Sequence, residues 1–118
     1  MKKRIMVADD DSAIVDVLQI VLEDAGFAVE TYAQGQSVKN MQEPFPDLVL
    51  LDILLAGMDG RVICRHLKNQ TATQRIPIIL LSAHTDAQQT ATDAGADAFL
   101  PKPFDIDELL DLVEKYLS

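Results

Sequence analysis

The chain reads LVLLD at residues 48–52, a run of four apolar residues that ends in a carboxylate. Three other short apolar runs also lead into polar residues: DDD at residues 9–11, Ser82, and Lys102 between two prolines. Short apolar runs of this length are typical of buried parallel strands. Because ligands of open α/β sheets bind beyond the carboxyl ends of the strands, we expect carboxylates, a hydroxyl and an ammonium to meet in one pocket.

The segments around these runs alternate between strand patterns and helix patterns. We predict strands at residues 4–8, 28–32, 48–51, 78–81 and 98–100, and helices at residues 12–25, 35–41, 61–68, 87–94 and 106–117. A glycine-rich loop is expected at residues 56–60. This order predicts an α/β fold, a doubly wound (βα)5 domain whose parallel five-stranded sheet carries helices on both faces. Since domains average roughly 150 residues, we expect residues 1–118 to form a single domain.

The composition excludes several classes of protein. The net charge is −9 and the ten Lys and Arg residues are dispersed, apart from a small cluster at residues 2–4. Direct binding of nucleic acid is not expected, because it needs a basic patch. The one cysteine, Cys64, leaves no internal disulfide and no cysteine-based metal site, as expected in a reducing compartment. No apolar run approaches the roughly 18 residues of a membrane span, so we expect a cytoplasmic chain without membrane contact.

The residues at the strand ends suit phosphoryl chemistry. Carboxylate oxygens favour hard cations such as Mg²⁺. Asp52, at the end of the predicted central strand, can attack a phosphoryl group, while Ser82 and Lys102 can each bind a phosphoryl oxygen. Each residue alone also has a structural interpretation: the aspartates at 9–11 as caps of the next helix, and the others as solvated strand-end or loop residues. The combination, with every residue at a strand end, favours the site.

The sequence resembles a receiver domain of the two-component response regulators, of the chemotaxis-regulator kind, over residues 3–117. The motifs that carry the resemblance are VADDD at 7–11, PDLVLLDI at 46–53, GMDG at 57–60, LSA at 81–83 and KPF at 102–104. The resemblance implies the flavodoxin-like strand order 2-1-3-4-5. It also implies a switch that assists its own phosphorylation and dephosphorylation, and is not otherwise an enzyme.

The resemblance implies a role for each carboxylate. Asp52 would accept the phosphoryl group from a histidine kinase or a histidine phosphotransfer protein. Asp9, Asp10 and Asp52 would hold Mg²⁺, or Mn²⁺ in its place, together with the backbone carbonyl of Leu54.

The resemblance also assigns the residues that respond to the phosphoryl group. Ser82 and Lys102 would contact its oxygens, and the bond between Lys102 and Pro103 would be cis. Phe99 would be the switch aromatic, which rotates inward as Ser82 moves. Phosphorylation would thereby change the surface formed by the fourth helix, fifth strand and fifth helix, where a downstream effector domain or protein would bind.

Two further positions flank the expected path of the water that hydrolyses the aspartyl phosphate. Leu54 and His84 occupy places where relatives vary, so we expect them to tune the lifetime of the phosphorylated form. The helix at 106–117 carries mainly acidic charges, and lacks the basic residues typical of relatives that dimerise there. We therefore expect a monomer. By resemblance, the helix at 12–25 and the loops near the site would dock the kinase.

Other functions fit the sequence less well. An Mg²⁺-dependent aspartyl-phosphate phosphohydrolase is the enzyme alternative, but one large family of that kind needs an aspartate where this chain has Leu54. A nucleotide- or flavin-binding module of the same architecture would need Gly, Ser or Thr at residues 9–11, where the aspartates would repel a phosphate. A degenerate receiver, which binds partners without phosphorylation, is disfavoured by the complete set of site residues.

Overall fold

The computed structural model describes residues 2–83 and 87–117. One parallel sheet holds β1 (Arg4–Ala8), β2 (Ala28–Tyr32), β3 (Leu48–Asp52), β6 (Ile78–Ser82) and β7 (Ala98–Pro101). Their order across the sheet is β2-β1-β3-β6-β7. This confirms the expected order 2-1-3-4-5, since β6 and β7 are the fourth and fifth strands of this sheet along the chain.

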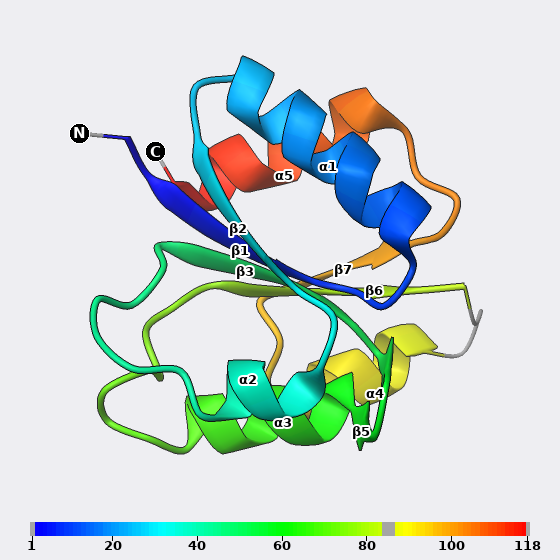
Figure 1. The fold of residues 1–118 in the computed structure, drawn as a ribbon. Coiled ribbons are helices and arrows are strands. Elements are labelled where there is room, and N and C mark those ends of the chain that lie inside the picture. The colour runs from blue at the N-terminus through cyan, green and yellow to red at the C-terminus, as the bar shows by residue number, and fades with distance from the viewer. Residues whose placement is uncertain (1, 84–86, 118) are drawn as a thin grey trace.

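Helices cover both faces of the sheet, as predicted. Figure 1 shows α1 (Ser12–Asp24) and α5 (Ile106–Leu117) on one face, and α2 (Gly35–Lys39), α3 (Gly60–Lys68) and α4 (Ala87–Asp93) on the other. Among the described residues, no helix has the length and apolar character needed to cross a membrane. The predicted helix at 35–41 ends two residues early, because Met41 N–H bonds to the carbonyl of Val38 in a tighter turn.

The loop expected at residues 56–60 is more ordered than the sequence suggested. A small antiparallel pair forms here: β4 (Leu54–Leu55) lies just before the expected loop, β5 (Met58–Asp59) lies within it, and Gly60 already belongs to α3. The reversal between the two strands is made at Gly57, whose φ of +80° is a conformation that glycine adopts without steric cost. Leu55 is buried and anchors the pair to the core. The segment that follows Asp52 is therefore held in a defined shape.

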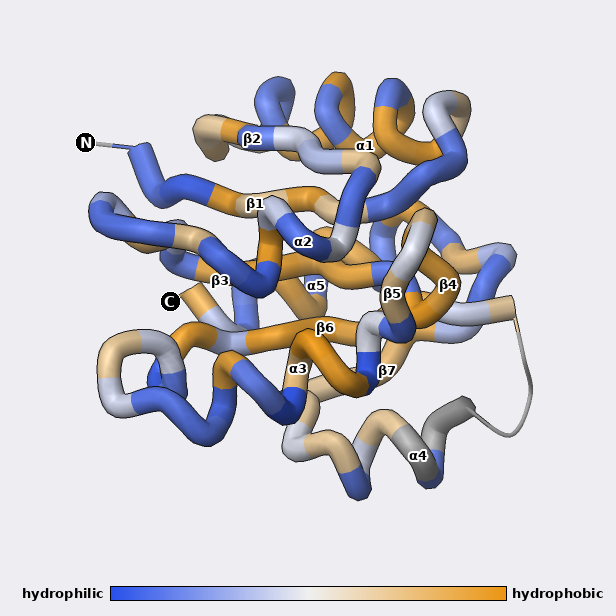
Figure 2. The backbone as a smooth tube through the Cα atoms, turned by 60° about the horizontal axis from the view of Figure 1, so that its bottom comes forward, coloured by the Kyte–Doolittle hydropathy of each residue, from blue (hydrophilic) through white to orange (hydrophobic). Residues whose placement is uncertain are grey.

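The hydrophobic core lies in two layers, one on each face of the sheet. Leu48 and Leu50 of β3 pack toward α1 and α5, whereas Val49 and Leu51 pack toward α2, α3 and α4. All five residues of β3 and all five of β6 are buried. Figure 2 shows hydrophobic residues concentrated along these central strands. Burial on both faces explains why the strands read as continuous apolar runs and not as alternating ones.

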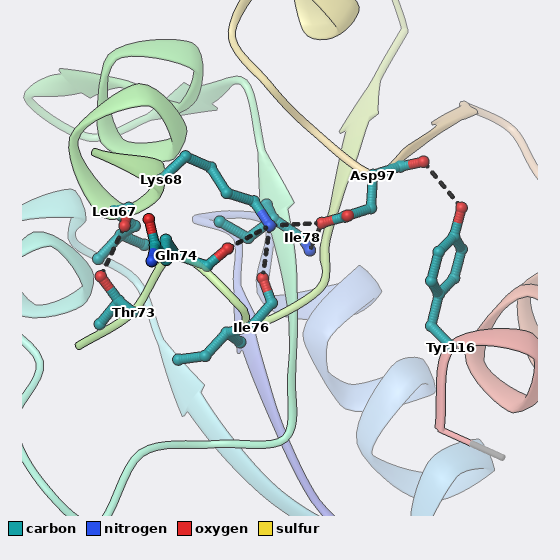
Figure 3. Close-up of polar contacts among 8 residues, drawn as sticks. All are labelled: Leu67, Lys68, Thr73, Gln74, Ile76, Ile78, Asp97 and Tyr116. Carbon is teal, nitrogen blue, oxygen red and sulfur yellow. Dashed lines mark hydrogen bonds and ion pairs between the residues drawn. The ribbon is translucent and has the colours of Figure 1, made fainter. Parts of the chain in front are cut away.

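A polar network closes the end of the sheet where the strands begin. The Lys68 ammonium donates to the carbonyl of Ile76 at 2.8 Å and to the Asp97 carboxylate at 2.7 Å, as Figure 3 shows. Asp97 also accepts the N–H of Ile78 at 2.8 Å, and its carbonyl accepts the hydroxyl of Tyr116 at 2.8 Å. The network joins α3, β6, β7 and α5, and leaves the opposite end of the sheet for the polar residues at the strand ends.

Candidate functional site

The parallel register brings the predicted site residues to one edge of the sheet. Ala8 lies opposite Leu51, so Asp9 follows β1 beside Asp52 at the end of β3. Asp52 itself lies opposite Leu81 of β6, and Ser82 is the next residue. The amide of Ile53 extends this pairing by donating to the carbonyl of Leu81 at 3.0 Å. Residues that are far apart in the sequence therefore meet because neighbouring strands end at the same level.

Three carboxylates form an acidic cluster at this edge. Ligand oxygens of Asp9, Asp10 and Asp52 all lie within 4.8 Å of one another. Asp9 is 1% exposed and Asp52 is 6% exposed, whereas Asp10 faces the solvent. Oxygen ligands with this spacing and concentrated negative charge fit a hard divalent cation such as Mg²⁺. The cluster is open on the side of Asp10, so water can complete the coordination.

The structure divides the DDD motif between two tasks. Asp11 is the N-cap of α1, because its Oδ1 accepts the N–H groups of Ala13 at 3.1 Å and Ile14 at 3.4 Å. The N–H of Asp11 in turn donates to Asp9 Oδ1 at 2.9 Å, which orients the Asp9 carboxylate. The capping alternative considered for the whole motif therefore holds for Asp11, and Asp9 and Asp10 belong to the acidic cluster.

Lys102 is the cation of the site. Its Nζ lies 2.8 Å from Asp9 Oδ2 and 3.5 Å from Asp52 Oδ2. Its backbone N–H donates to the carbonyl of Ser82 at 2.8 Å, and the bond to Pro103 is cis. Burial lowers the pKa of the Lys102 ammonium. Hydrogen bonding to Asp9 and the negative charges of Asp52 and Asp9 raise this pKa by more than burial lowers it, so the net shift is upward. The side chain therefore stays protonated between the carboxylates.

The remaining predicted site residues lie in different environments. Ser82 is 1% exposed at the end of β6. Leu54 is 58% exposed, beside the acidic cluster in sequence but turned to solvent. Phe99 is half-buried and packs against the core layer formed with α3 and α4. His84 lies outside the described residues, so its predicted place is untested.

The environment of Asp52 disfavours its charge. Burial, and after it the nearby negative charge of Asp9, raises the pKa of the Asp52 carboxyl from its ordinary 3.8 to a net value of about 6. The Lys102 ammonium and a hydrogen bond from the backbone of Leu54 act in the opposite direction but do not offset this. A buried carboxylate beside like charges is costly until a cation joins it.

We expect Asp52→Asn to stabilise the fold at neutral pH when no divalent cation is present. The pKa of Asp52 is higher in the folded state, about 6, than its ordinary 3.8, so the wild type loses stability as pH rises through that interval. The difference should be smallest below pH 3.8, should grow as pH rises from 3.8 to about 6, and should level off at roughly 3 kcal/mol above pH 7. Urea unfolding of both proteins in EDTA at several pH values measures it, and a difference that does not vary with pH would contradict the expectation.

One residue of the site was missed by the sequence reasoning. A Cβ on Gly60 would lie 2.2 Å from the backbone oxygen of Asp52. The sequence offered one indication of this close contact, namely the glycine that follows Asp59 at the start of a predicted helix. Glycine has a low helix propensity, so its presence there points to a need for space and not to a benefit for the helix.

Comparison with known proteins agrees with this geometry. The family model of the response regulator receiver domain matches residues 5–114. The chain belongs to the response regulator receiver domain family. Receiver domains act as phosphorylation switches in two-component systems, which confirms the predicted family and the general function.

Relatives of the receiver domain extend this result. The DNA-binding response regulator MtrA of Mycobacterium tuberculosis is 40% identical over 113 residues, which are 93% of this chain and 48% of that protein. The chain thus spans about half the length of such curated relatives. A structure from Chloroflexus aurantiacus, assigned as a response regulator, has a TM-score of 0.93 and 32% identity, and covers 99% of this chain and 98% of its own.

A third comparison bears on the acidic cluster. The receiver domain of a sensor histidine kinase from Pseudomonas aeruginosa has a magnesium ion coordinated in its active-site cleft. Its TM-score to this receiver domain is 0.85, with 25% identity and 98% of each chain covered.

Proposed function

We propose that this receiver domain is switched by phosphorylation of Asp52, with the phosphoryl group supplied by a histidine kinase or a histidine phosphotransfer protein. The observation that carries the proposal is the placement of one buried carboxylate, Asp52, between two others and an ammonium. Its oxygen lies within 4.8 Å of oxygens of Asp9 and Asp10, and 3.5 Å from Lys102 Nζ. Phosphoryl transfer needs mainly positioning and charge neutralisation, and this arrangement supplies both.

The transfer itself is a displacement at phosphorus. A carboxylate oxygen of Asp52 attacks the phosphorus atom, the bond from phosphorus to the donor histidine nitrogen breaks, and that nitrogen keeps the electron pair. Asp9, Asp10, Asp52 and the backbone carbonyl of Leu54 would hold Mg²⁺, or Mn²⁺, which would supply charge neutralisation. Lys102 provides a second positive charge for the phosphoryl oxygens.

The response to the phosphoryl group involves Ser82 and Phe99. Ser82 is buried at the end of the strand next to Asp52, which supports a role for its hydroxyl in hydrogen bonding a phosphoryl oxygen. Phe99 lies on β7, next to β6, and borders a groove against α5. A movement of Ser82 would shift Phe99 and so change the surface formed by α4, β7 and α5. A downstream effector domain or protein would bind at that surface. The receiver domain itself would be monomeric and cytoplasmic.

The phosphodonor protein would dock beside Lys102, on the α1 side of the site. An apolar cavity of about 460 Å³ lies there, bordered by α1 residues such as Ile14 and Val17 and by Pro103 and Phe104. Val17 is 49% exposed and Ile20 on the same helix is 68% exposed. Apolar side chains left open to solvent beside a reactive site are typical of a protein-binding surface.

Acetyl phosphate tests the proposal without a cognate kinase. The protein is incubated with this small phosphodonor in Mg²⁺ or in EDTA, and its intact mass is recorded with time. We expect one phosphoryl adduct that forms in Mg²⁺ and fails to form in EDTA. Absence of the adduct in Mg²⁺ would favour a degenerate receiver, and sustained turnover of p-nitrophenyl phosphate would favour the phosphohydrolase. We do not expect that turnover, because Leu54 occupies the position where such a phosphohydrolase needs an aspartate as general acid.

Leu54 is expected to slow the hydrolysis of the aspartyl phosphate. Its side chain is 58% exposed at the edge of the site, where an apolar group hinders the approach and orientation of water. We expect Leu54→Asn to shorten the lifetime of the adduct about tenfold, an effect in the range of general positioning effects on a reacting water. Decay of the intact-mass adduct after removal of acetyl phosphate measures the lifetime. Val62→Asn, a change of an exposed apolar residue on α3, is the control, and an equal lifetime in the Leu54 variant would refute the role.

A further inference from the structure

The first residue of α3 packs directly on the backbone of the phosphoacceptor. A Cβ built on Gly60 would lie 2.2 Å from the carbonyl oxygen of Asp52, and 3.0 Å from both the carbonyl carbon of Asp52 and the Cα of Ile53. These are backbone atoms of a buried strand end, so no change of rotamer can relieve the contact. The φ angle of Gly60 is not in the left-handed region, so the requirement for glycine is steric.

Hydrogen bonds hold the two segments in this contact. The N–H of Gly60 donates to the carbonyl of Ile53 at 2.7 Å. Asp59 caps α3 by accepting the N–H of Arg61 at 2.8 Å, and the Arg61 guanidinium binds the same carboxylate. Asp59 also pairs with Leu54 across the β4–β5 ladder. The start of α3 is therefore attached on both sides to the turn that follows Asp52.

We propose that Gly60 is a positioning residue for the phosphoacceptor. Its lack of a side chain lets the first turn of α3 rest against the Asp52–Ile53 peptide, and this contact sets the direction of the Asp52 carboxylate and of the Leu54 carbonyl. The inference rests on the proposed function, since it concerns the geometry of phosphoryl transfer to Asp52. It adds a role for the α3 start that neither the acidic cluster nor Lys102 fulfils.

The size of the displacement indicates the expected effect. Real Cβ atoms essentially never approach another heavy atom closer than 3.0 Å, so a side chain at Gly60 would have to open the 2.2 Å separation by about 0.8 Å or more. The contacts of Asp52 with Lys102 at 3.5 Å and with the other carboxylates depend on the same peptide. A misplacement of about 1 Å in a reacting group can cost roughly a hundredfold in rate.

Gly60→Ala, compared with Gly35→Ala, tests the inference. A Cβ on Gly35 would lie 2.7 Å from Ile63 Cδ1 and 2.8 Å from Met58 Cβ, so this control introduces a clash of similar kind in which the nearest atoms belong to side chains and not to the Asp52 backbone. Three quantities are measured for each folded variant: the phosphorylation rate with acetyl phosphate, the Mg²⁺ dissociation constant by calorimetry, and the urea midpoint. We expect both variants to unfold at lower urea. We expect Gly60→Ala alone to be phosphorylated about a hundredfold more slowly and to bind Mg²⁺ more weakly.

The outcomes separate this inference from the proposed function. If the wild type forms no adduct, the proposed function fails. If the wild type forms the adduct and folded Gly60→Ala matches it in rate and Mg²⁺ affinity, the role of Gly60 is overturned. Should Gly60→Ala fail to fold, Asp59→Ala replaces it, because loss of the cap loosens the same turn of α3 without a clash. We then expect a severalfold slower phosphorylation, and an unchanged rate in that variant overturns the inference as well.

Discussion

Asp52→Asn is expected to form no phosphoryl adduct with acetyl phosphate and Mg²⁺ under conditions in which the wild type becomes fully labelled. The amide has no anionic oxygen to attack phosphorus, and the other carboxylates of the cluster are placed differently. Asp9 is bound to Lys102 at 2.8 Å, and Asp10 is exposed to solvent. Intact mass at successive times, with the fold verified by circular dichroism, measures the result.

The matched control for this variant is Asp47→Asn. Asp47 lies just before β3, at the opposite end of the strand from Asp52, and its Oδ2 accepts the N–H of Arg4 at 2.7 Å. It is a partly buried aspartate with a structural contact and no part in the site. We expect it to be labelled like the wild type. An adduct retained in Asp52→Asn, mapped by peptide mass to another aspartate, would show that the acceptor has been misassigned.

Lys102→Met is expected to slow phosphorylation by about a hundredfold, a loss similar to that from removing one donor to a developing anion. Methionine keeps most of the length of the side chain but takes away the ammonium 2.8 Å from Asp9 and 3.5 Å from Asp52. The phosphoryl oxygens then have one fewer positive partner. Rates with acetyl phosphate at saturating Mg²⁺ measure the effect, and Lys115→Met on α5 is the control.

Lys102→Met should slow phosphorylation without weakening the binding of Mg²⁺. In the wild type, the Lys102 ammonium already occupies an oxygen of Asp9 and attracts Asp52, so it competes with a divalent cation for their negative charge. Without it, we expect Mg²⁺ to bind at least as tightly as in the wild type, by calorimetry. A Lys102→Met protein that binds Mg²⁺ poorly and is also phosphorylated slowly would indicate a disordered site, and the rate loss would then say nothing about the charge of Lys102.

Most of the fold could be predicted because its determinants are local in the chain. The strands at LVLLD and its counterparts were evident because burial on both sheet faces leaves no room for polar residues. Where prediction was wrong, a contact distant in sequence decided the outcome. The loop around Gly57 forms a β4–β5 pair because Leu55 is buried in the core, and the sequence around it contains no alternation that would indicate strands.

The candidate site shows the same division. The sequence by itself determined that Asp9, Asp52, Ser82 and Lys102 follow the carboxyl ends of strands. It could do so because each strand is a short apolar run that ends where the first polar residue appears. Only the tertiary structure decided that Lys102 binds Asp9 and that Gly60 rests on the peptide of Asp52. These contacts depend on the register of adjacent strands and on how the helices pack against the sheet. Such distances are set by packing of the whole core, and no local pattern of residues encodes them.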